Sequence, residues 1–215
     1  MITRNRAWLI FEFSLLCVVL PTVIIVFRLA PFMFVFLWVV SLYCFLTLRL
    51  QHPDFAKDMW KWREIKWKHF KTILPRWVFA CVAMVVFLYF YEAERLFALV
   101  LERPQLVVSL FILYPLLSAL PQEFIFCSFF FERYKTLFTT ERARIIASAI
   151  VFAYAHVLYI NWVAPLFSLI GGLIFALTYS KTRSLALVTI EHALYGNALF
   201  LIGLGWYFYG GAVVQ

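Results

Sequence analysis

The sequence predicts an all-α protein, a polytopic transmembrane helical bundle of about seven spans that forms a single transmembrane domain over 1–215. The 215-residue chain is 65% hydrophobic and 14% charged, with a mean hydropathy of +0.91. Soluble domains are about 45–50% apolar and 25% charged. The apolar residues also fall into seven long runs, and most basic residues lie between them. These observations exclude a soluble domain and a disordered chain.

Uninterrupted apolar runs mark the predicted spans, because a helix needs about 20 apolar residues to cross a bilayer. The runs cover 9–27, 30–48, 77–91, 105–131, 145–160, 162–180 and 185–204. The first run contains Pro21 and is not followed by a small-residue cleavage site. We therefore interpret it as a retained helix rather than a signal peptide. Whether 202–214 forms an eighth, re-entrant segment stays open.

The distribution of basic residues predicts an N-in/C-out orientation. With the amino terminus inside, the inside segments carry 16 of the 19 Lys and Arg residues. The outside segments carry Arg28, Arg95 and Arg103. Cytoplasmic loops retain Lys and Arg, so this unequal distribution sets the expected orientation.

The region 50–76 predicts a basic, amphipathic cytoplasmic segment at the membrane interface. Within it, 55–71 is expected to form one helix, because its lysines fall on one face and its aromatic residues fill much of the rest. A helix of this kind lies among anionic headgroups, so anionic lipids are expected partners. Nucleic acid is not an expected partner, because the flanking spans hold the segment at the bilayer.

Several ionisable residues lie inside predicted spans, where a charge needs a partner or a water-filled cavity. They are Glu123 in the fourth span, His156 in the fifth, and Glu191 and His192 in the seventh. From the helical rise, Glu123, His156 and His192 lie about 12, 16 and 10 Å from the predicted cytoplasmic ends. This shared depth predicts a single cavity open to the cytoplasm. Glu12, near the start of the first span, is expected to be solvated.

Pro121 disturbs the fourth span close to Glu123. It removes one backbone hydrogen bond and frees the carbonyl of Leu117. At membrane depth this defect is tolerated only beside protein or water. We therefore expect a kinked helix that forms one wall of the cavity.

Three short blocks follow one another on separate predicted spans in the second half of the chain. The blocks are Pro121-Gln122-Glu123, Phe152 with His156, and Glu191-His192 followed by Asn197. Over roughly 120–205, this ordered set resembles the CAAX protease and bacteriocin-processing family of intramembrane endopeptidases. The resemblance implies that 105–204 contains the catalytic core helices. It also implies an integral protein of the bacterial cytoplasmic (inner) membrane, with its active site facing the cytoplasm.

The resemblance further implies hydrolysis of a peptide bond by a Glu-activated water. Glu123 would act as general base, and His156 would bind and orient the water. His192 and Asn197 would stabilise the oxyanion. The implied substrate is a membrane-anchored or membrane-presented protein or peptide, including a lipid-anchored protein, and no cofactor is expected.

The blocks depart from the family pattern at three positions. Gln122 stands where the family has the first Glu of a pair, and Cys127 stands where it has an Arg. Cys127 lies four residues after Glu123, so both share one helix face. Asn197 lies five residues after His192, where the family has four. We expect Gln122 and Cys127, together with Phe152, to line the site.

Several alternatives stay open. Gln122 and Cys127 favour a catalytically impaired member that acts as an immunity, scaffold or chaperone-like membrane protein. A zinc-dependent peptidase would use Glu123, His156 and His192 as ligands, since two His and one Glu form a catalytic zinc set. A haem or quinone protein would use the two histidines as axial ligands. The sequence alone does not determine the substrate, the involvement of prenylation or the oligomeric state.

Overall fold

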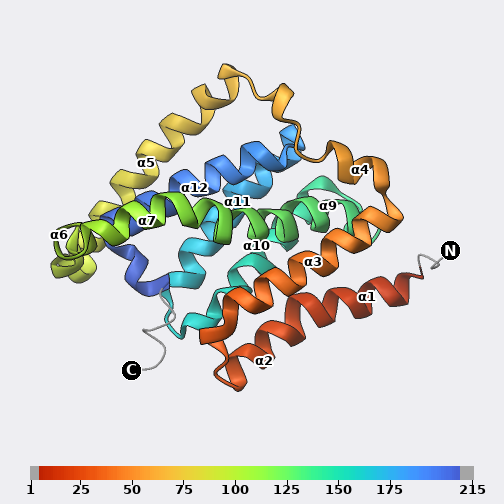
Figure 1. Cartoon of the computed structure of the whole chain (residues 1–215), viewed down its shortest axis with the longest axis horizontal. Coiled ribbons are helices and arrows are strands. Elements are labelled where there is room, and N and C mark those ends of the chain that lie inside the picture. Colours follow the sequence, from red (N-terminus) through yellow and green to blue (C-terminus); the bar gives the residue numbers. More distant parts are fainter. Residues whose placement is uncertain (1–4, 209–215) are drawn as a thin grey trace.

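The computed structural model describes residues 5–208, and over that range the protein contains helices and no strand. Most of the long helices run side by side along the longest axis of the molecule (Figure 1). The first span consists of α1 (Arg6–Ser14), η1 (Leu15–Val19) and α2 (Leu20–Val26). Other long helices are α3 (Met33–Gln51), α5 (Trp67–Glu92), α10 (Glu141–Ala155), α11 (Val163–Thr182) and α12 (Leu185–Ile202). Short helical turns join them: η2 (Ala30–Phe32), α4 (Pro53–Asp58), η3 (Trp62–Glu64), η4 (Ala93–Arg95), α6 (Ala98–Glu102), η7 (Val157–Tyr159) and η8 (Leu204–Phe208).

The seven predicted spans are confirmed as seven helices long and apolar enough to cross a membrane within the described residues. They are Arg6–Val26, Ala30–Gln51, Trp67–Arg95, Pro104–Arg133, Glu141–Tyr159, Val163–Thr182 and Leu185–Ile202. The third starts ten residues before the predicted 77, because α5 continues through Pro75. The eighth segment stays a prediction, since only its beginning, including η8, lies within the described residues.

The prediction of a single helix at 55–71 is wrong. α4 ends at Asp58 and α5 starts at Trp67, with η3 between them. Lys61 has a left-handed backbone, with φ of 46°, and Lys66 is extended, with φ of −123°. Both conformations interrupt an α-helix, so the segment folds as two short turns that lead into the third span.

The fourth span is a chain of short helices rather than one regular α-helix. It consists of α7 (Pro104–Tyr114), η5 (Pro115–Ala119), α8 (Leu120–Glu123), η6 (Phe124–Phe129) and α9 (Phe130–Arg133). Both η5 and η6 are π-helical, and such wide turns occur often at functional sites. The carbonyl of Leu117, which Pro121 deprives of its donor, accepts a hydrogen bond from Trp38 Nε1 at 3.1 Å. This contact agrees with the predicted release of that carbonyl.

A buried ion pair joins the first and fourth spans at one end of the bundle. Arg133 donates to both carboxylate oxygens of Glu12, from Nε at 2.7 Å and from Nη2 at 3.1 Å. Tyr43 also donates to Glu12, at 2.5 Å, and Arg133 donates to Gln51. Glu12 is 2% exposed, so the expectation that it is solvated is wrong. The two-pronged guanidinium contact replaces the water that the carboxylate loses.

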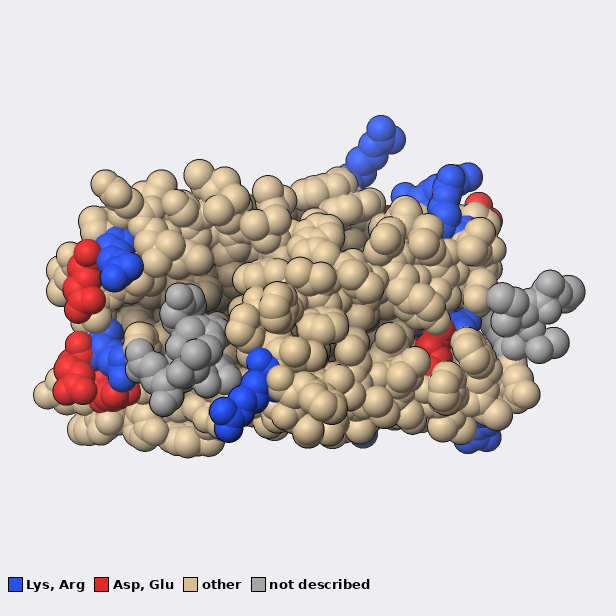
Figure 2. Space-filling view, turned by 60° about the horizontal axis from the view of Figure 1, so that its bottom comes forward, with Lys and Arg blue, Asp and Glu red and all other residues tan. Residues whose placement is uncertain are grey.

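Large apolar side chains cover the outside of the bundle. Leu50 and Phe90 are each 82% exposed, and Phe79 is 75% exposed. On the face seen in Figure 2, Lys, Arg, Asp and Glu gather mainly at the two ends of the molecule, and the surface between them carries few charges. Such a surface suits hydrocarbon in the middle and polar headgroups at the ends. With its seven apolar helices, the chain is an integral membrane protein.

Candidate active site

The predicted site residues come from three spans that pack against one another. Glu123 ends α8, His156 follows α10, and His192 lies in the middle of α12. Within the described residues, α12 contacts η5 and α8 of the fourth span, while α10 packs mainly on α11. The irregular fourth span therefore faces the regular seventh span at the depth of Glu123.

Glu123 and His192 are in direct contact. His192 Nδ1 lies 2.7 Å from Glu123 Oε1, and the side chains are 1% and 7% exposed for Glu123 and His192 respectively. Glu123 Oε2 is buried and has no hydrogen-bond partner in the described structure. The pair is thus a carboxylate held on one oxygen by an imidazole, with its second oxygen open to a further donor.

Tyr114 completes a chain of three polar side chains. Its hydroxyl lies 2.8 Å from His192 Nε2, so both ring nitrogens of His192 have a partner. The Tyr114 ring passes over Gly196, where a Cβ atom would overlap it. Tyr114 was not predicted as a site residue from the sequence. The available signal was Gly196, which lies four residues after His192 and leaves room beside it for a large ring.

Aromatic rings surround both histidines. Phe175 stacks on the His192 imidazole, with ring centroids 4.5 Å apart. Phe152 contacts both histidines, with its centroid 5.8 Å from His192 and 4.6 Å from His156. His156 Nδ1 is 2.7 Å from the carbonyl oxygen of Phe152. The structure therefore brings Glu123 and His192 together, whereas His156 is bonded to the Phe152 backbone.

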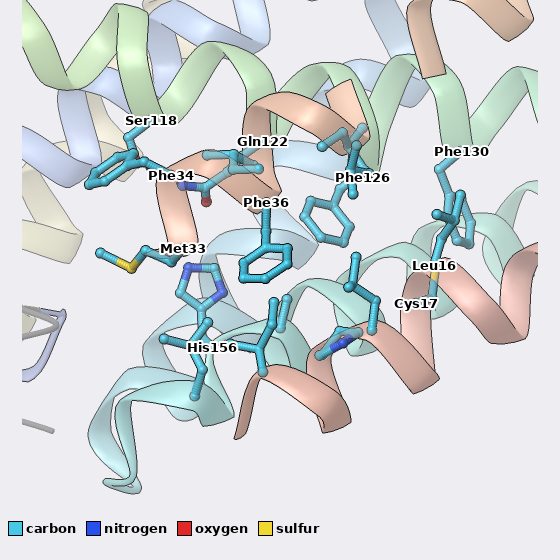
Figure 3. A pocket seen from close by; sticks show the side chains of 18 of the residues that line it. Leu16, Cys17, Met33, Phe34, Phe36, Ser118, Gln122, Phe126, Phe130 and His156 are labelled. Carbon is cyan, nitrogen blue, oxygen red and sulfur yellow. Dashed lines mark hydrogen bonds between the residues drawn. The ribbon is translucent and has the colours of Figure 1, made fainter. Parts of the chain in front are cut away.

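An apolar cavity of about 130 Å³ lies on the His156 side of the site. Its walls come mainly from the first, second and fourth spans, and its polar lining includes Gln122, Ser118 and His156. Figure 3 shows the Gln122 amide and the His156 ring reaching into this cavity, toward each other, among aromatic and aliphatic side chains. Gln122 Nε2 donates to Ser118 Oγ at 2.8 Å, and Gln122 Oε1 has no partner in the described structure. Glu123 does not line the cavity.

A second buried polar pair lies next to the first along α12. Glu191 is fully buried and forms an ion pair with Arg76, which also donates to Thr178 at 2.9 Å. Arg76 is the tenth residue of α5 and lies inside the third span, although the sequence predicted it in the loop before that span. This pair ties the third, sixth and seventh spans together around the segment that carries His192.

Comparison with protein families identifies the second half of the chain. Residues 104–198 match the model of the family described as type II CAAX prenyl endopeptidase Rce1-like. The match begins at the first residue of the fourth span and ends within the seventh span. No curated protein and no solved structure matches the chain.

The Rce1-like region contains the whole polar chain of Tyr114, Glu123 and His192, and it also contains His156 and Asn197. Arg76 lies outside it. Asn197 is five residues after His192 on a regular α-helix, which places it about 140° around the helix axis. Asn197 Oδ1 is buried and has no hydrogen-bond partner in the described structure. The structure therefore directs Asn197 away from the face of α12 that carries His192.

Of the predicted site-lining residues, Cys127 lies close to the Glu123 carboxylate. Cys127 is buried in η6, and its thiol faces Glu123, as their spacing predicts. Among residues 5–208, no group of three or more His, Cys, Asp and Glu side chains is arranged to hold a metal ion. In particular, Glu123, His156 and His192, the three ligands of the zinc alternative, do not form such a group.

Proposed function

We propose that this protein is an intramembrane endopeptidase that hydrolyses a peptide bond of a membrane-anchored or membrane-presented protein or peptide, with Glu123 as the general base. The observation that carries the proposal is the buried contact between Glu123 and His192 inside an Rce1-like region. The match of residues 104–198 to the Rce1-like model supports an intramembrane protease of the CAAX type. The free Oε2 atom of Glu123 supports the role of this particular carboxylate.

In this proposal, Glu123 moves a proton at each step. A water bound at Oε2 gives its proton to the carboxylate as its oxygen attacks the substrate carbonyl carbon. The protonated Glu123 then gives this proton to the leaving nitrogen as the C–N bond breaks, so the carboxylate is regenerated without a covalent intermediate. The surrounding aromatic rings keep other water out, which strengthens the electrostatic interactions of the developing charge.

His192 positions Glu123 in this scheme. Its Nδ1–H donates to Glu123 Oε1, and its Nε2 accepts from the Tyr114 hydroxyl. With both nitrogens occupied, the His192 ring binds an oxyanion only if Tyr114 moves aside. We therefore propose that His192 orients the base. The bonds to Glu123 and Tyr114 determine which ring nitrogen of His192 carries the proton.

The apolar cavity suits the membrane-embedded part of a substrate. Most of its lining side chains are aliphatic or aromatic, and its few polar groups include Gln122 and His156. Gln122 directly precedes Glu123 in the chain, so the cavity lies at the depth of the base, although the Glu123 side chain points about 100° away from Gln122 around the helix axis. We propose that the cavity takes the hydrophobic or lipid-modified part of the substrate, and that the site opens to the cytoplasm of a bacterial inner membrane.

One observation favours a second candidate, a catalytically impaired member that binds such segments without cleaving them. Of the two positions 122 and 123, where the family has a pair of Glu residues, only Gln122 lines the cavity. The amide of Gln122 cannot act as a base. Variants with Gln122→Glu and Cys127→Arg restore the family pattern. If they raise cleavage from an undetectable level, this second candidate is correct. Cleavage by the natural sequence, within about tenfold of the restored variants, supports the endopeptidase.

The test of the endopeptidase begins in cells that express the natural chain, Glu123→Gln, His192→Ala or Glu132→Gln. Mass spectrometry of new protein termini in their membranes identifies cleaved bonds. Each bond is then offered as a synthetic peptide to purified protein in proteoliposomes. Glu132 is the matched control, since it is bonded to Lys135 near the end of the same span.

We expect the natural chain and Glu132→Gln to cleave alike. Glu123→Gln should lower the rate by about 100-fold or more, the usual worth of a general base. His192→Ala should also lower the rate, because it frees the carboxylate from its partner. Cleavage by Glu123→Gln at the natural rate would rule out Glu123 as the base.

A further inference from the structure

A polar cavity of about 390 Å³ lies at the end of the bundle opposite to α6, where the third span begins and the sixth passes into the seventh. One wall comes from the start of α5 and includes Lys66, Lys68 and His69. The other wall comes from the link between α11 and α12 and includes Lys181. This basic pocket, as we call it, is separate from the apolar cavity and from the Glu123 site.

The basic pocket carries an unbalanced positive charge. Lys66, Lys68 and Lys181 line it, against the single carboxylate of Glu64. Glu64 Oε1 already lies 3.6 Å from Nζ of Lys61, a lysine that does not line the pocket, so this carboxylate does not fully neutralise the three lining lysines. Among residues 5–208, none of the three lining lysines is paired with a carboxylate. An anion that enters the pocket therefore meets three cations that it can bind directly.

Backbone contacts hold the two walls of the basic pocket in place. Ser184 Oγ accepts from Leu187 N at 3.1 Å and donates to the carbonyl of Trp60 at 3.0 Å. Leu185 N donates to the carbonyl of Met59 at 2.9 Å. These bonds dock the turn before α5 on the start of α12. The pocket is thus formed before any ligand arrives, which lowers the entropic cost of binding.

The position of the basic pocket along the spans corresponds to the headgroup layer. α5 begins at Trp67, α11 ends at Thr182, and both belong to membrane spans. Trp62 and Trp67, on or beside the same wall, are 58% and 67% exposed, and exposed tryptophans are enriched at the membrane interface. Basic pockets between the ends of membrane helices bind the headgroups of anionic lipids.

We propose that the basic pocket binds one phosphate group through Lys66, Lys68 and Lys181, and that it is a specific anion site rather than a part of a diffuse basic surface. A phosphate group carries the charge and the several acceptor oxygens that three ammonium groups require. It reaches this depth either as the headgroup of an anionic phospholipid or as a soluble phosphate compound. The inference does not depend on the proposed peptidase activity.

The test uses the full chain in nanodiscs of phosphatidylcholine with increasing phosphatidylglycerol or cardiolipin. Native mass spectrometry then counts the anionic lipids that each protein retains. The pocket variant carries Lys66→Gln, Lys68→Gln and Lys181→Gln. The control variant carries Lys57→Gln, Arg63→Gln and Lys71→Gln, which remove the same charge from exposed positions outside the pocket.

A second arm identifies the source of the phosphate group. The same proteins, in nanodiscs of phosphatidylcholine alone, are titrated calorimetrically with inorganic phosphate and with glycerol 3-phosphate. Binding in the first arm alone assigns the pocket to a lipid headgroup. Binding in this second arm, lost in the pocket variant, assigns it to a soluble phosphate compound.

We expect the pocket variant to bind the ligand about 100-fold more weakly, since each lost charge-assisted hydrogen bond to the phosphate group lowers the affinity by at least about fivefold. The control variant should stay within about fivefold of the natural protein. Equal losses in the two variants would show diffuse surface attraction and would overturn the proposal. No loss in the pocket variant would overturn it as well. The substituted lysines are exposed, so thermal unfolding should confirm that both variants fold.

Discussion

The contact between Gly196 and Tyr114 gives a sharp prediction of stability. In Gly196→Ala, the new methyl group overlaps the Tyr114 ring, so the ring must move and its hydroxyl leaves His192 Nε2. Overpacking costs about 1–3 kcal/mol, and a buried nitrogen without its partner costs a further 1–3 kcal/mol, roughly. The better helix propensity of alanine returns about 1 kcal/mol. We therefore expect a net loss of about 3 kcal/mol.

The assay is thermal unfolding of the purified protein in one detergent, where about 3 kcal/mol corresponds to a fall of roughly 6–12 °C in Tm. A double-mutant cycle with Tyr114→Ala isolates the contact. In that background the methyl group meets no ring, so Gly196→Ala should stabilise the protein by about 1 kcal/mol through helix propensity. Gly171→Ala is the control, because its methyl group comes no closer than 3.2 Å to the Phe175 ring. An equal loss in both backgrounds would refute this explanation.

Three further predictions follow from other contacts. Tyr114→Phe should slow the proposed cleavage about fivefold in kcat with KM unchanged, since it removes one hydrogen bond of about 1 kcal/mol from the group that orients the base. Steady-state kinetics in proteoliposomes check it. Arg133→Met should lower stability by about 3–5 kcal/mol, because Glu12 stays buried without a partner, and adding Glu12→Leu should recover most of that loss in thermal unfolding. Trp38→Phe should cost about 1 kcal/mol by the same assay, because it removes the donor to the freed carbonyl of the fourth span.

The seven spans and the shared depth of Glu123 and His192 were predictable from the sequence. Hydrophobic runs of about 20 residues have one stable arrangement in a bilayer, and the helical rise converts their positions into depth. Two ionisable groups at one depth in apolar surroundings stabilise each other by pairing. His156 lies at a similar depth but meets the backbone of Phe152, because depth does not specify the direction in which a side chain points.

The partners of the buried polar groups were not predictable. Tyr114 and Glu191 each meet a residue from a different span, Tyr114 through His192 and Glu191 through Arg76. Which spans are neighbours depends on the packing of whole helices, and a single sequence does not state it. The break at Lys61 was equally hidden, since the turn takes its shape by docking on the start of α12.

The two wide turns that flank α8 have a consequence for how insertions and deletions act on this protein. A π-helical turn accommodates one residue more than an α-helical turn. Deletion of one residue from Pro115–Ala119 would thus allow η5 to become α-helical while Tyr114 keeps its orientation relative to Glu123, whereas a deletion from a regular α-helical turn would rotate the two residues by about 100°. The wide turn therefore lets the length of the fourth span change by one residue without changing which residues meet at His192. Among relatives of this chain, a one-residue gap in η5 would be compatible with the same site, whereas a one-residue gap in α8 would not.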